Sequence, residues 1–156
     1  MAVVKNGFTL IELIVAFSVI SILATVGVAS FVSYSRLQTL QTATYELSTT
    51  LGLARSRAYS QVKPSECTGQ TSLDGYRVTL SVSDNSYVLD AICSGSSHTE
   101  LAKTLPKDIT FDRLQSTSTS FLFPVIAGGV VGAGKIVVSG YGQTKTITVN
   151  SAGDIR

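Results

Sequence analysis

Ionisable side chains are almost absent from the first part of the chain. Between Phe8 and Val32 the sequence has only one, Glu12, and the same stretch has no proline. A helix needs roughly 20 apolar residues to cross the hydrocarbon core of a membrane. Core helices of soluble proteins seldom stay apolar on every side for so long, and cleavable secretory signals have a shorter apolar region. The stretch therefore predicts a membrane-spanning or membrane-anchored helix over residues 8–32.

Residues that catalyse reactions or bind metals are also scarce. The chain has a single histidine, His98, in a serine-rich stretch, and its cysteines form no Cys-x-x-Cys pair. Zinc sites need several such ligands at short spacing, and no serine, histidine and carboxylate pattern indicates an active site. We expect no metal site, no cofactor and no enzymatic activity. We also expect His98 to lie in a loop, exposed to solvent.

Indications of nucleotide or nucleic-acid binding are weak. The chain has 12 Lys and Arg against 10 Asp and Glu, a net charge of +2, which gives no electrostatic argument for nucleic acid. Gly129–Lys135 reads GVVGAGK and matches the spacing of a phosphate-binding loop. Such a loop needs Ser or Thr next and then a helix, but Ile136 follows, and VVSG is typical of a strand. We interpret the segment as a hairpin turn.

The two cysteines, Cys67 and Cys93, both follow the apolar stretch. Lys5 beside that stretch favours a cytoplasmic N-terminus, which would place both cysteines in an oxidising compartment, where disulfides persist. A bridge closing a loop of about 25 residues would contribute roughly 3 kcal/mol. We predict this disulfide, and two unpaired thiols are the alternative.

After Phe31 the apolar spacing becomes that of a helix with one buried face. The stripe consists of Leu37, Leu40, Thr44, Leu47, Leu51, Ala54 and Ala58. Pro64 disfavours helix for the residue before it, so we expect an amphipathic helix over residues 33–62.

Beyond residue 62, short strand-forming runs alternate with Gly, Ser and Asn. Residues 75–82 and 86–93 predict a hairpin that ends at Cys93, and further strands are expected within 108–114, 119–126, 134–140 and 145–156. A long helix followed by many strands is an α+β pattern. We expect the helix stripe to pack on the antiparallel sheet of a globular head, residues 63–156.

The segment Gly7–Glu12, GFTLIE, resembles the prepilin signature of type IV pilins and type II secretion pseudopilins. The resemblance implies that a prepilin peptidase removes the leader, residues 1–7, by cutting between Gly7 and Phe8, and that the new Phe8 amine is methylated. Glu12 would then meet the N-terminal amine of a neighbouring subunit in a helical filament. It also implies a pilin fold, a single pass through the inner membrane and a head on the periplasmic side.

Three further stretches resemble the H-type minor pseudopilins and FimT-type minor pilins: Leu53–Gln61, Thr119–Gly134 and 145–156. This branch implies a minor subunit that initiates or caps a type IV pilus or secretion pseudopilus. The tryptophan that often precedes the first hairpin strand of the branch is absent.

Two other functions stay open at this point. One is a minor pilin that binds DNA during uptake, with contacts from Lys135, Lys145 and Arg156. FimT-type proteins of that kind end in Gly-Arg-x-Arg, whereas this chain has Gly153-Asp-Ile-Arg, and the acid would repel phosphate. The other alternative is a major pilin that builds the shaft.

Overall fold

The computed structural model describes residues 7–69 and 72–156. Helix α1 spans Leu10–Tyr59, and a short 3-10 helix, η1, follows at Ser65–Cys67. The chain divides into two compact units; the first ends at Arg36, and the second, here called the head, runs from Leu37 to Arg156. The strands of the head are β1 (Leu73–Ser81), β2 (Ser86–Cys93), β3 (Ser96–Thr104), β4 (Ile109–Phe111), β5 (Ser120–Pro124), β6 (Gly134–Gly140) and β7 (Gln143–Val149).

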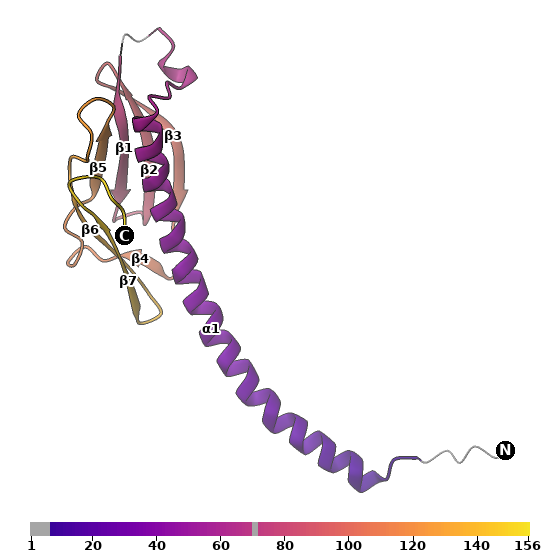
Figure 1. Ribbon diagram of the computed structural model, residues 1–156. Coiled ribbons are helices and arrows are strands. Elements are labelled where there is room, and N and C mark those ends of the chain that lie inside the picture. Colours follow the sequence, from indigo (N-terminus) through magenta and orange to yellow (C-terminus); the bar gives the residue numbers. More distant parts are fainter. Residues whose placement is uncertain (1–6, 70–71) are drawn as a thin grey trace, which may run out of the picture. The chain divides into compact units, whose positions relative to one another are not determined.

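These strands form two antiparallel sheets in the order β3-β2-β1-β5 and β4-β6-β7 (Figure 1), which confirms the predicted α+β class. The register of the larger sheet places Tyr76 on β1 opposite Ala91 on β2 and Phe123 on β5. All three side chains are buried, so one face of this sheet supplies apolar side chains to the core. In the smaller sheet, Ile136 stands opposite Ile147, and both are buried in the same cluster.

The part of α1 within the head covers this core with most of the predicted stripe, but Leu37 and Thr44 are only half-buried. Leu40, Leu47, Leu51, Ala54 and Ala58 are all buried and belong to one apolar cluster with the strand residues. Sequence spacing did not include Thr50, which is also buried and whose hydroxyl donates to the Glu46 carbonyl at 2.9 Å. This bond satisfies the hydroxyl within the helix, so a threonine is tolerated in the core.

The end of α1 agrees with the position predicted from Pro64. Gln61 takes a left-handed conformation with φ 51°, and its N–H donates to the Ala58 carbonyl at 3.2 Å. The Val62 N–H donates to the Arg57 carbonyl at 3.1 Å. This pair of bonds is the Schellman motif, which satisfies the last carbonyls of a helix and usually has glycine where this chain has Gln61.

The expectation of a solvated loop around His98 is wrong. Residues Ser96–Thr104 form β3, which pairs along its length with β2, and His98 is half-buried with a shielded Nε2 atom. The missed signal is Ser94-Gly95, whose φ values of 49° and 81° make a two-residue turn between Cys93 and Ser96. Positive φ at both central residues is the geometry that suits a tight hairpin.

The predicted membrane segment, residues 8–32, lies mostly in the first unit's part of α1. The side chains at positions 25–27 and 29 lie outside the description. Among the residues that are described, no helix is both long and apolar enough to cross a membrane.

Candidate functional site at the start of α1

Glu12 takes part in the N-terminal cap of its own helix. Its backbone N–H donates to the Thr9 Oγ1 at 3.3 Å, and its carboxylate accepts from the Thr9 N–H at 3.5 Å. This reciprocal arrangement is a capping box, which satisfies two of the N–H groups that a helix start leaves without partners. The Thr9-x-x-Glu12 spacing in the sequence is typical of a capping box, although Thr9 was not among the predicted site residues. The cap fixes the carboxylate at the first turn of α1.

The apolar side chains around Glu12 have no cover from the chain itself. Phe8 is 82% exposed and Leu10 78% exposed. Other large apolar side chains in the described part of the segment are exposed by 40% or more: Ile11, Leu13, Ile14, Val15, Phe17, Val19, Ile20, Ile22, Leu23, Val28, Phe31 and Val32. The hydroxyls of Ser18 and Ser21 donate to the carbonyls of Val15 and Phe17, both at 2.8 Å, and need no outside partner. An exposed apolar surface of this extent marks an interaction site.

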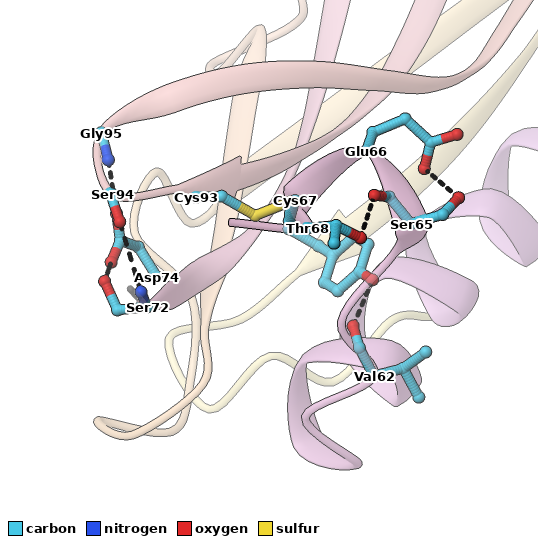
Figure 2. The surroundings of a disulfide bond; sticks show 11 residues. Val62, Ser65, Glu66, Cys67, Thr68, Ser72, Asp74, Cys93, Ser94 and Gly95 are labelled. Atoms are coloured by element: carbon cyan, nitrogen blue, oxygen red, sulfur yellow. Dashed lines mark hydrogen bonds between the residues drawn. A yellow bond between two sulfur atoms is a disulfide. The ribbon is translucent and has the colours of Figure 1, made fainter. Parts of the chain in front are cut away.

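The two cysteines form the predicted disulfide (Figure 2). It joins Cys67 on η1 to Cys93 at the end of β2, with a Cα–Cα distance of 5.9 Å, and both residues are fully buried. Close by, the Tyr76 hydroxyl donates to the Val62 carbonyl at 2.6 Å. Burial raises the pKa of this phenol, so the hydroxyl keeps its proton and its role as donor. The connection from helix to sheet is thus tied to β1 and β2.

The proposed DNA contacts do not gather at one place on the head. Lys135 on β6 lies opposite Thr148 on β7, and Thr148 exchanges two backbone bonds with Arg156, so the three residues form one row. Lys145 is three positions from Thr148, and successive strand side chains alternate between faces. The register therefore places Lys145 on the other face of the sheet, away from Lys135 and Arg156.

Asp154, near the C-terminus, makes two polar contacts with other side chains. Asp154 accepts from the Asn150 side-chain amide at 3.1 Å and lies 3.0 Å from the Arg55 Nη2. The hydrogen bond from Asn150, and then that from Arg55, hold the pKa of Asp154 below its ordinary value. The carboxylate stays charged and fastens the C-terminal turn to α1.

The glycine-rich segment Gly129–Lys135 leads into strand β6 rather than a helix, but the predicted hairpin turn is wrong, because β5 and β6 belong to different sheets and the segment connects them. Gly129 and Gly132 have φ values of 72° and 92°, which favour glycine. A Cβ atom on Gly129 would lie 2.5 Å from the Ser151 carbonyl oxygen. The glycines thus allow close backbone packing.

Comparison with known proteins identifies one family description. The prokaryotic N-terminal methylation motif matches residues 4–28, a range that contains Gly7, Phe8 and Glu12. No matching protein was found among curated sequences, and none among solved structures.

Proposed function

We propose that this chain, which carries the N-terminal methylation signature of type IV pilins and pseudopilins, is a minor subunit that helps initiate or cap a type IV pilus or a type II secretion pseudopilus. Proteins with this signature are structural subunits rather than enzymes. Their assembly buries the N-terminal helices of many subunits against one another.

The observation that carries the proposal is the lone carboxylate of Glu12 within an exposed apolar segment. Once the leader is removed, Phe8 begins the chain and its amine is a cation. An acid in an apolar environment is costly unless it is paired. The amine of a neighbouring subunit supplies the opposite charge. This pairing also fixes the axial register between the N-terminal helices of the two subunits.

The exposed apolar side chains that the structure describes within residues 8–32 support a position in a membrane before assembly and in the filament core afterwards. With Lys5 on the cytoplasmic side, the head faces the periplasm. The disulfide between Cys67 and Cys93 is in keeping with that oxidising compartment.

The minor role rests on the resemblance of Leu53–Gln61 and of the C-terminal segment to the H-type and FimT-type branch. DNA uptake is the less favoured function because Asp154 stands where an arginine is needed and because Lys145 faces away from Lys135.

The experiment that tests the proposal is the mass of the protein purified from the envelope of its native host. Processing between Gly7 and Phe8 removes seven residues and adds a methyl group to the new amine. Gly7→Leu should leave the full-length precursor, whereas Val4→Leu, a bulky change in the same leader, should be processed normally. Intact Met1 on the wild-type protein would rule the proposal out.

A further inference from the structure

The edge strands of the two sheets differ in how much of their outer backbone is hydrogen-bonded to other parts of the chain. The outer edge of β5 is bridged at one residue, where Leu122 and Val131 exchange backbone bonds of 2.9 and 2.8 Å, and the outer edge of β7 is bridged at Thr148, which exchanges two backbone bonds with Arg156. β4 has only three residues. β3 has nine, and within residues 7–69 and 72–156 its backbone pairs with β2 alone. Its outer edge therefore presents N–H and C=O groups that can pair with another strand.

A groove lies beside this open edge, between α1 and β3. It measures about 290 Å³ and is lined by Tyr45, Thr49 and Leu53 of α1 and by Leu101 of β3. Tyr45 is 73% exposed and Leu53 38% exposed, so apolar surface is available there. The charges at the groove are already paired, because the Lys103 Nζ lies 3.0 Å from the Glu46 Oε2.

We propose that the outer edge of β3 binds an extended, uncharged segment of another protein, which adds a fifth strand to the sheet and places one aliphatic side chain in the α1–β3 groove. Main-chain bonds supply affinity in this mode of recognition, and a pocket for alternate side chains supplies specificity. The exposed residues of β3 are small: Ser96, Ser97, Thr99, Ala102 and Thr104. They leave room for an incoming backbone.

The β-bulge near Glu100 indicates which half of β3 lies beside the groove and so where the partner's aliphatic side chain would bind. The register with β2 shifts between Leu89 and Asp90, so β3 is divided into Ser96–Thr99 and Leu101–Thr104. Only the second half borders the groove, through Leu101 and Lys103. We therefore place the aliphatic side chain of the partner beside Leu101. This inference concerns the head alone and holds whether or not the N-terminal segment enters a filament.

The probe is the synthetic peptide acetyl-Lys-Thr-Val-Thr-Val-Thr-Val-Lys-amide, whose six central residues form the uncharged segment and whose terminal lysines keep it in solution. It is added to the ¹⁵N-labelled full chain in detergent micelles. The readout is hydrogen exchange of the backbone amides of β3, residue by residue. At a peptide concentration ten times its Kd, we expect the outward-facing amides of Leu101–Thr104 to exchange about tenfold more slowly. The amides of the interior strand β2 should not change.

Two matched variants test the groove. Thr49→Phe fills it from an exposed position of α1, whereas Thr42→Phe makes the same change at an exposed position that does not line it. We expect the first to abolish the protection of β3 and the second to leave it intact. If fast exchange of the β2 amides shows that the Thr49→Phe variant has unfolded, Tyr45→Ala takes its place. Tyr45→Ala removes one wall of the groove and should weaken peptide binding at least threefold.

Three outcomes would overturn the inference. One is unchanged exchange of the β3 amides at millimolar peptide, and another is protection that neither Thr49→Phe nor Tyr45→Ala weakens. The third is slow β3 exchange without peptide, together with a dimer in sedimentation, because a second copy would then occupy the edge.

Discussion

The Arg57 Nη1 lies 2.8 Å from the Glu100 Oε2, so a charge-assisted hydrogen bond joins the last turn of α1 to β3. The two side chains are 33% and 16% exposed, and the other carboxylate oxygen of Glu100 is buried with no hydrogen-bond partner in the described part of the chain. The guanidinium also lies 6.0 Å from the centre of the Tyr76 ring. The pair therefore fixes the end of α1 to β3, the strand that pairs with β2.

Arg57→Ala should lower the free energy of unfolding of the head by about 2 kcal/mol, because it leaves a shielded carboxylate without its partner. Lys103→Ala breaks an exposed pair with Glu46 and should cost much less than Arg57→Ala. Urea denaturation of both variants makes the comparison, and equal losses would contradict the importance of burial at Glu100.

Replacing both cysteines with alanine should lower the free energy of unfolding by about 3 kcal/mol. The bridge links residues 26 positions apart, and the loss of this loop closure makes the unfolded chain freer. Urea denaturation of the double variant, compared with the oxidised wild type, measures the loss. An unchanged midpoint would show that the Tyr76–Val62 bond and the core hold η1 without the sulfur link.

The titration of Asp154 should reflect both of its side-chain donors. Because its folded pKa lies below the ordinary 3.8, its stabilising contribution is present above that value and is lost as the pH falls through the folded pKa. Asn150→Ala and Arg55→Ala should each raise this pKa, since hydrogen bonds from both side chains lower it. Carboxyl ¹³C shifts followed from pH 7 downward measure the pKa in both variants, and an unchanged pKa in either would refute the assignment.

Glu12→Gln separates the two roles of this residue. Glutamine can complete a capping box, so the start of α1 should be retained, but it cannot pair as an anion with an amine. We expect both Glu12→Gln and Glu12→Ala to be depleted from sheared filaments, while both accumulate normally in the membrane fraction. Normal incorporation of Glu12→Gln would mean that capping alone explains the carboxylate.

The soluble portion from about Ser35 onward should give no gel shift with duplex DNA even at low salt. Lys135 and Arg156 form too small a basic group to release many counterions, and Asp154 lies beside it. A shift that weakens steeply as salt rises would restore DNA uptake as the function, and Lys135→Ala with Arg156→Ala should then remove it.

The parts of the fold that follow a regular period were predictable from sequence. The stripe from Leu40 to Ala58 specified the buried face of α1, and the alternation in residues 75–82 and 86–93 specified β1 and β2. β3 was missed because its residues alternate little in polarity: Ser97, Thr99 and Thr104 give no apolar face, and the bulge near Glu100 interrupts the period.

Long-range polar contacts were not predictable in the same way. Nothing in the sequence near Arg57 indicates Glu100, since their contact depends on where β3 lies in the sheet. The same is true of the Tyr76 bond to Val62. By contrast, Thr9-x-x-Glu12 is a local pattern, and its cap could have been predicted from the spacing alone.

The disulfide also determines how the head would respond to mechanical tension. A pull on the N-terminal segment travels along α1 to η1, crosses the sulfur atoms to Cys93 and continues along the chain into β3. The chain between the two cysteines, which contains β1 and β2, lies outside this covalent load path. Reduction would reroute the force through β1 and β2, and the head should then yield at a lower pulling force.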